Sequence, residues 1–156
     1  EYKKTQLVKL VSENVPEGGA YFMFDWFSDI PQQLHIYTGR KNASRFPFFM
    51  YFAVMELMPN VVTEDERKII TEKYTRMIAE DIERHDPKML LIARIDYNGD
   101  GQLYDIWGNL LKYKHEYNDL SSYEFWKTVE INEIDYRPAT KPKDKKNVID
   151  IYMRDF

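Results

Sequence analysis

The segment 96–101 has the residue types of the first half of a calcium-binding loop. Its sequence, DYNGDG, places oxygen-bearing side chains and a glycine where such a loop needs them. The loop's last ligand should be a bidentate glutamate, and Trp107 stands at that position. A turn from a strand into a helix also selects Gly, Asn and Asp for their backbone angles. We therefore favour a plain turn over a calcium site.

Asp25 and Asp96 each lie at the end of an apolar run, 20–26 and 89–95 respectively. If these runs are neighbouring parallel strands, both carboxylates face the crevice where open α/β sheets bind ligands. A carboxylate pair at that position serves acid/base chemistry or holds a cation. In the alternative interpretation, which we favour, each aspartate caps a turn or pairs with an arginine.

Arg45 belongs to the stretch SRFP at 44–47, inside a long segment that follows the first apolar run. The planar guanidinium of an arginine in such a loop can clamp a phosphate or a carboxylate. Alternatively, Arg45 forms an ion pair with Asp25 or Asp29 that orders the loop. Both interpretations stay open. The candidate ligand-binding residues are therefore Asp25, Asp29, Arg45 and Asp96.

Other kinds of site find little support in the sequence. The chain has no cysteine, which excludes disulfides, thiolate metal sites and cysteine nucleophiles. His35, His85 and His115 lack the close spacing of zinc ligands. No phosphate-binding glycine loop and no serine nucleophile motif occurs. We expect no metal and no cofactor, and we assign no catalytic residue.

The two apolar runs predict strands buried on both faces, at 20–26 and 89–95. Between them, Thr63 and Glu66 have the spacing of a capping box, which predicts a long helix beginning there. Two buried strands connected through a helix are typically parallel neighbours.

The remaining elements complete the predicted fold. They are a helix at 2–14, an irregular stretch at 27–62 with a short helix at 48–57, a helix at 103–111, and strands at 125–136 and 148–154 joined by a mobile, lysine-rich loop at 141–146. We expect one α/β domain, residues 1–156, with an open, mostly parallel, Rossmann-like sheet of about four or five strands. Helices cover its faces, and a C-terminal antiparallel hairpin lies on its edge.

Composition limits the classes of protein that remain. The 156 residues suit one domain, and 44% of them are hydrophobic. The net charge of −4 argues against a dedicated nucleic-acid binder. No apolar run reaches the roughly 18 residues of a membrane-spanning helix.

Several short motifs occur in a characteristic order, covering roughly residues 14–95. They are VPEGGA at 15–20, Pro31, YTG at 37–39, SRFP at 44–47, EDI at 80–82 and DPK at 86–88. This arrangement resembles the C-terminal soluble region of bacterial multi-pass membrane proteins of the polyprenyl-phosphate-sugar-dependent glycosyltransferase class. The lysine-rich segment 141–146 and the long final hairpin depart from that pattern.

The resemblance implies an extracytoplasmic, periplasmic domain, tethered by transmembrane helices outside this sequence. In such transferases the catalytic acid lies in a loop near the first membrane helix. The isolated domain is then non-catalytic, and it contributes acceptor or ligand binding. Its implied partners are the membrane-embedded part of the same protein and a lipid-linked sugar or acceptor.

Two other functions remain as alternatives. The first is a stand-alone binding module for an anionic small molecule or a protein partner. The second is a soluble enzyme that uses Asp25 and Asp96, which we disfavour because no nucleophile or base motif supports it.

Overall fold

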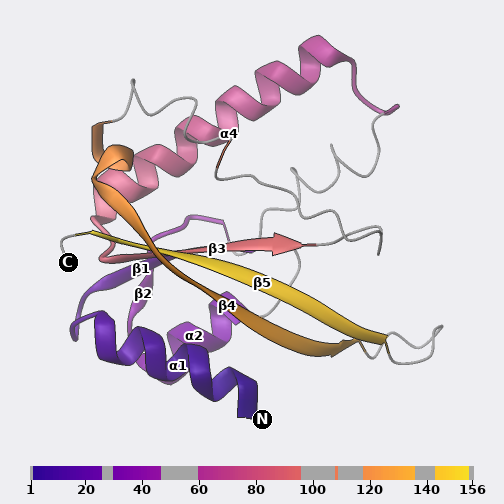
Figure 1. The fold of residues 1–156 in the computed structure, drawn as a ribbon. Coiled ribbons are helices and arrows are strands. Elements are labelled where there is room, and N and C mark those ends of the chain that lie inside the picture. The colour runs from indigo at the N-terminus through magenta and orange to yellow at the C-terminus, as the bar shows by residue number, and fades with distance from the viewer. Residues whose placement is uncertain are drawn as a thin grey trace.

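The computed structural model describes residues 2–25, 30–46, 60–95, 108, 118–135 and 143–154. In chain order the elements are α1 (Tyr2–Asn14), β1 (Ala20–Phe24), α2 (Ile30–Thr38), β2 (Lys41–Asn42), α4 (Glu64–His85), β3 (Met89–Ile95), the 3-10 helix η1 (Asn118–Ser122), β4 (Tyr123–Asp135) and β5 (Lys143–Arg154). The strands form one sheet in the order β2-β1-β3-β5-β4. Figure 1 shows α4 on one side of this sheet and α1 with α2 on the other. The α/β class is confirmed.

One half of the sheet is parallel. β1 and β3 are neighbours, with Tyr21 opposite Met89 and Phe24 opposite Ile92. The prediction that the two apolar runs form adjacent parallel strands is confirmed. The short strand β2 lies on the outer side of β1, also parallel to it.

The other half of the sheet is antiparallel. β5 pairs with β3 on one side and with β4 on the other. The predicted C-terminal hairpin is confirmed, with β4 as the edge strand. The sheet is therefore mixed, and the expectation of a mostly parallel sheet holds only for its β2-β1-β3 half.

The prediction of a mobile loop at 141–146 is wrong for residues 143–146, and residues 141–142 lie outside the described residues. Lys143, Lys145 and Lys146 belong to β5, and the structure does not make them part of a loop. The register sets Glu133 opposite Lys145 and Asp135 opposite Lys143, so charges of opposite sign occupy paired positions. Opposite charges at facing positions of two antiparallel strands favour their pairing.

The stretch 27–62, predicted to be irregular, contains α2 and β2. Pro31 is the second residue of α2, where a missing backbone N–H costs no helical hydrogen bond. Gly39 ends the helix with a positive φ of 67°, and its N–H donates to the His35 carbonyl at 3.0 Å. The predicted helices at 48–57 and 103–111 fall outside the described residues, except for Gly108.

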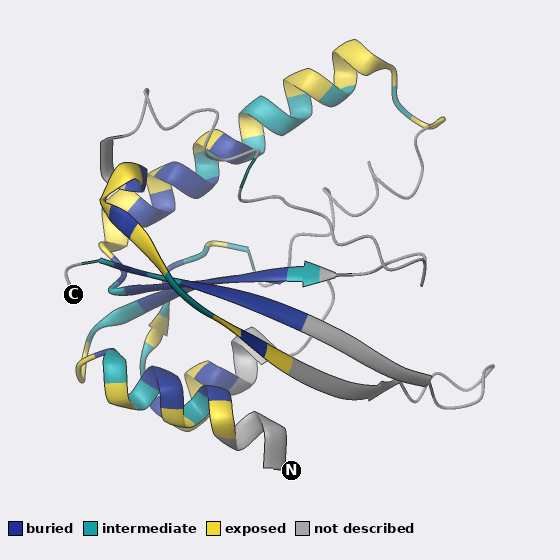
Figure 2. Ribbon diagram, in the orientation of Figure 1, coloured by how far each residue is buried: buried dark blue, intermediate teal, exposed yellow. Residues whose placement is uncertain are grey.

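Helix α4 begins and ends as predicted. The Thr63 N–H donates to the Glu66 carboxylate at 2.8 Å, and the Glu66 N–H donates to the Thr63 hydroxyl at 3.3 Å. This confirms the capping box. Asp86, before Pro87, has left-handed backbone angles and stops the helix. The buried residues of α4 all lie in its C-terminal half, over the sheet, whereas its N-terminal half is largely exposed (Figure 2).

The core forms between the sheet and the helices on its two faces. Strand β1 is its centre, because Tyr21, Phe22, Met23 and Phe24 are each at most 1% exposed. Burial raises the pKa of the Tyr21 hydroxyl above its ordinary value.

Arg40 joins the C-terminal ends of α1 and α2. Its guanidinium donates to the carbonyls of Ser12, Val15 and Thr38 at 3.3, 3.1 and 2.5 Å. Carbonyls at helix ends have no partner within the helix, and a cation suits the negative end of the helix dipole. Arg40 is therefore a structural residue that fixes the two helices beside the start of β2.

Candidate functional site

Asp25 follows β1 directly, at the edge where the parallel strands end. Its side chain lies in the core, and the residue is only 2% exposed. β3 runs parallel to β1, so its C-terminal end lies at the same edge of the sheet. Open α/β sheets bind ligands at this edge. A buried carboxylate at this position is consequently the central feature of the candidate site.

Two other predicted site residues cannot be placed. Asp29, Asp96 and the calcium-like turn 96–101 lie outside the described residues. The proximity of Asp25 to Asp96 therefore stays a prediction, as does the absence of calcium.

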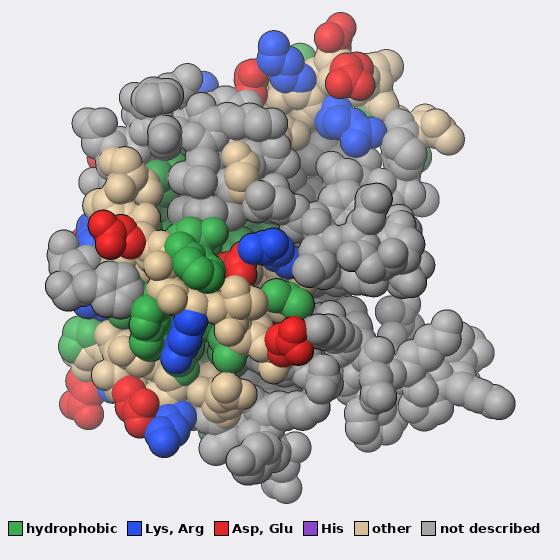
Figure 3. All heavy atoms as spheres, viewed as in Figure 1, with side chains coloured by type: hydrophobic (Ala, Val, Ile, Leu, Met, Phe, Trp, Pro, Cys, Tyr) green, Lys and Arg blue, Asp and Glu red, His purple; other side chains and the backbone are tan. Residues whose placement is uncertain are grey.

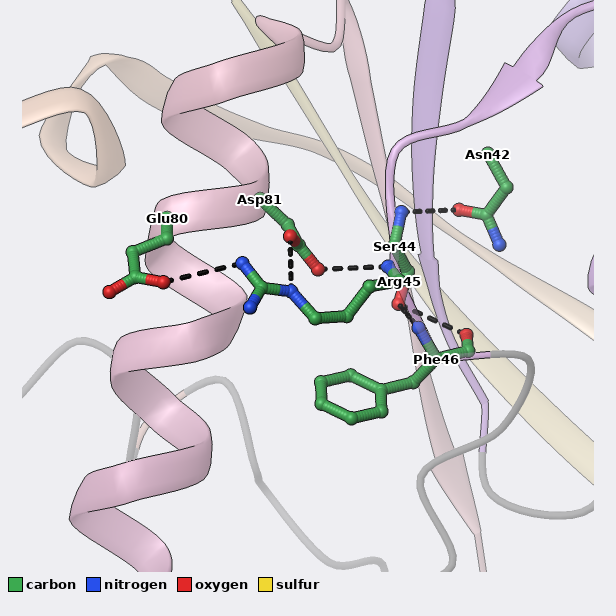
Figure 4. A network of polar contacts seen from close by, with 6 residues as sticks. All are labelled: Asn42, Ser44, Arg45, Phe46, Glu80 and Asp81. Atoms are coloured by element: carbon green, nitrogen blue, oxygen red, sulfur yellow. Dashed lines mark hydrogen bonds and ion pairs between the residues drawn. The ribbon is translucent and has the colours of Figure 1, made fainter.

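Arg45 is placed by the structure, and its partners differ from those expected. Its Nε donates to Asp81 at 2.6 Å, its backbone N–H donates to the same carboxylate at 2.8 Å, and its Nη2 donates to Glu80 at 3.3 Å. Among the described residues, its ion-pair partners are therefore Asp81 and Glu80 and not Asp25, while Asp29 lies outside the described residues. Figure 4 shows the Arg45 side chain reaching α4 from the segment that follows β2.

Burial differs strongly between the members of this network. The Asp81 side chain is 2% exposed, whereas that of Arg45 is 33% exposed and that of Glu80 is 46% exposed. The hydrogen bond to Asp81 raises the pKa of Arg45. The buried carboxylate of Asp81 therefore holds the Arg45 side chain on its inner side, whereas Glu80 contacts it at the protein surface.

The backbone around Arg45 is fixed by its neighbours (Figure 4). The Asn42 side-chain carbonyl accepts hydrogen bonds from the N–H groups of Met23 and Ser44, each at 3.2 Å. The Ser44 hydroxyl donates to the Phe46 carbonyl and accepts from the Phe46 N–H, both at 3.1 Å. This shapes a tight turn that presents Arg45 to α4.

Phe46 secures the same turn by packing. Its ring meets that of Tyr74 on α4 edge to face, with centroids 5.8 Å apart. The SRFP segment thus contacts α4 through a charge pair and an aromatic pair. Its first role is to hold the segment after β2 against the helix.

The sequence did contain a signal for the partner of Arg45. Asp81 lies between Ile78 and Ile82 on the apolar side of the long helix, and all three are buried. A buried carboxylate requires a partner, because an unpaired buried charge is very costly. Which cation supplies it could not be read from the sequence, since the two residues are 36 positions apart.

Among the described residues, no group of three or more His, Cys, Asp or Glu side chains could hold a metal ion. No helix in the described part of the chain is long and apolar enough to cross a membrane. No protein-family model, curated protein or solved structure matches the chain.

Proposed function

We propose that this chain is a non-catalytic binding domain whose ligand is held where β1 and β3 end. The observation that carries the proposal is the buried carboxylate of Asp25 directly after β1, next to the parallel strand β3. In a Rossmann-like arrangement this edge is the ligand crevice. A carboxylate there accepts hydrogen bonds from hydroxyl groups, which suits a sugar or another hydroxyl-rich acceptor.

We further propose that the domain belongs to the extracytoplasmic side of a membrane glycosyltransferase-like protein. The support is the set of motifs in the sequence. Two of them, SRFP at 44–47 and EDI at 80–82, make contact through Arg45, Asp81 and Glu80. Motifs that form one structural unit are better support for a resemblance than separate short matches.

The face seen in Figure 3 agrees with a ligand other than nucleic acid. Among the described residues, acidic and basic side chains are interspersed there with small groups of apolar ones. Nucleic-acid binders instead gather lysine and arginine on one surface.

Two measurements test this proposal. The reading frame that contains the chain should encode several apolar stretches of about 20 residues upstream of Glu1. In the encoded full-length protein, Asp25→Asn should lower sugar-transfer activity strongly, and the thermal midpoint of the isolated domain shows how much of that loss comes from destabilisation at this buried position. Glu83→Gln, at an exposed position of α4, is the matched control. Wild-type transfer activity in Asp25→Asn would remove Asp25 from the site.

The alternative is a stand-alone module for an anionic small molecule. It is favoured by the exposure of one third of the Arg45 side chain. Against it, Glu80 and Asp81 give the Arg45 site an excess of negative charge. Titration with inorganic phosphate, followed by amide NMR shifts, separates the two functions. Shifts at Arg45 that disappear in Arg45→Gln would favour the anion-binding module.

A further inference from the structure

A second set of interacting side chains links β3, β5 and β4 across the antiparallel half of the sheet. Asp150 of β5 is 2% exposed. Arg94 of β3 contacts one of its carboxylate oxygens through both Nε and Nη2. Thr128 of β4 donates to the other oxygen at 2.8 Å. The buried carboxylate thus holds one charged and one hydroxyl side chain in fixed positions.

An exposed aromatic ring adjoins this polar group. Phe125 of β4 is 55% exposed, and its ring meets that of Tyr152 at a centroid distance of 5.7 Å. The register pairs Phe125 with Tyr152 and Thr128 with Asp150. Alternate residues of a strand share a face of the sheet, so the aromatic pair and the polar group lie in adjacent rows on one face.

A β-bulge in β4 is responsible for this arrangement. The register slips between Phe125 and Lys127, which leaves Trp126 as the extra residue. Without the bulge, Phe125 would share a face with Val129, which is 8% exposed and packs in the core. The bulge instead turns Phe125 to the face of Thr128. Bulges that redirect a side chain are frequent beside functional sites.

The charges of this face do not favour a bound anion. Asp150 neutralises Arg94, and the exposed residue Glu130 follows two positions after Thr128 on the same strand. A free anion would gain little there. The Arg94 side chain is 37% exposed, and its Nη1 makes no hydrogen bond within the described part of the chain. Arg94 therefore still offers donors, and the Thr128 hydroxyl can accept.

We propose that this face binds an uncharged saccharide ring. The apolar C–H face of a pyranose stacks on Phe125, while its hydroxyl groups bond to Arg94 Nη1 and Thr128 Oγ1. Asp150 acts as a positioning residue, because it fixes both polar groups before the ligand arrives. Arg94 lies near the end of β3, but the proposal does not depend on the function proposed for Asp25.

Ligand-detected saturation-transfer NMR and amide shift mapping test the site, with maltotriose, cellotriose and tri-N-acetylchitotriose as probes. At least one of these sugars should bind, with a Kd in the weak millimolar range. The amide shifts should centre on Phe125, Thr128 and Asp150. Phe125→Ala should weaken binding about fivefold or more, whereas Phe125→Tyr, which keeps an aromatic ring, should bind nearly as wild type does. Arg94→Gln should also weaken binding.

Tyr37→Ala is the matched control, because Tyr37 is an exposed aromatic residue on α2, 67% exposed. It should leave sugar binding unchanged. The amide spectra of all variants report whether they are folded. The proposal is overturned if none of the three sugars binds, if Phe125→Ala binds like wild type, or if glucuronate or inorganic phosphate binds this face more tightly than the neutral sugars.

Discussion

Arg45 donates two hydrogen bonds to the carboxylate of Asp81, one from its backbone N–H at 2.8 Å and one from Nε at 2.6 Å. The acceptor is buried and the donor is partly exposed. The pair therefore satisfies a carboxylate inside the core and at the same time ties the segment after β2 to α4. Removing this pair should therefore lower the stability of the domain, and any effect on ligand binding should be secondary.

The first prediction concerns Arg45→Ala. The substitution should lower the free energy of unfolding by about 2 kcal/mol, because the buried Asp81 carboxylate then keeps only its backbone donor. This figure lies between the typical contributions of exposed and of buried ion pairs to stability. Arg45→Lys keeps the charge but loses the planar fork, and its effect should be intermediate. Urea denaturation of the isolated domain measures both. Arg76→Ala, at an exposed position of α4, is the control. Equal stability of Arg45→Ala and wild type would show that the pair contributes nothing.

A second prediction addresses the pair of Arg94 and Asp150. In a double-mutant cycle with Arg94→Gln and Asp150→Asn, the coupling free energy should be about 1 to 2 kcal/mol. The reason is that either single change leaves a buried or partly buried polar group without its partner. Denaturant midpoints of the four proteins supply the cycle. Additive effects of the two changes would mean that the coupling free energy between the two side chains is zero.

The sequence predicted the elements that are buried on both faces. β1 is an unbroken apolar run and β3 is apolar except for Arg94, and the capping box of α4 is a local pattern of two residues. Such signals do not depend on the rest of the fold. The antiparallel hairpin was also predictable, although its strands are longer than the apolar pattern suggested.

The errors of prediction have identifiable physical causes. Pro31 and Gly39 favour irregular chain when each is considered alone, yet proline in the first turn and glycine just past the end are the preferred positions of these residues around a helix. Lys143–Lys146 look like a loop because they carry no apolar pattern. They extend β5 beyond the end of its pairing with β3 at Asn147, where β5 pairs with β4 alone among the described strands.

The partner of Arg45 and the orientation of Phe125 depend on tertiary structure. The first requires the packing of α4 against the segment after β2. The second requires the bulge at Trp126, which reverses the alternation of side chains that sequence patterns assume. Neither was accessible from local residue types.

A third prediction tests the end of α2. Gly39→Ala should destabilise the domain by about 1 kcal/mol, because a Cβ disfavours its positive φ of 67°. The space around Gly39 is open, with nothing within 4 Å of an added Cβ, so no steric clash contributes. Gly39→Asn should cost less, since asparagine tolerates left-handed angles. Thermal midpoints rank the three proteins, and an equal loss for Ala and Asn would contradict the conformational explanation.

The last prediction is a pH dependence at the start of α4. The hydrogen bond from the Thr63 backbone, together with the one from its side chain, lowers the pKa of Glu66. A carboxylate with a lowered pKa in the folded state contributes stability above its unfolded pKa, and this contribution is lost as the pH falls through the folded value. Glu66→Gln should therefore be less stable than wild type at neutral pH, and the difference should shrink below about pH 4.3.

Denaturant unfolding of both proteins between neutral pH and about pH 3 measures this convergence. Thr63→Ala removes the side-chain donor, so it should reduce the pH-dependent part of the difference. Thr63→Ser keeps the hydroxyl and should retain it. Because Glu66 is exposed, the effect should be small beside that of the buried pairs. Parallel stability curves for wild type and Glu66→Gln across the whole range would show that the capping carboxylate does not contribute through its charge.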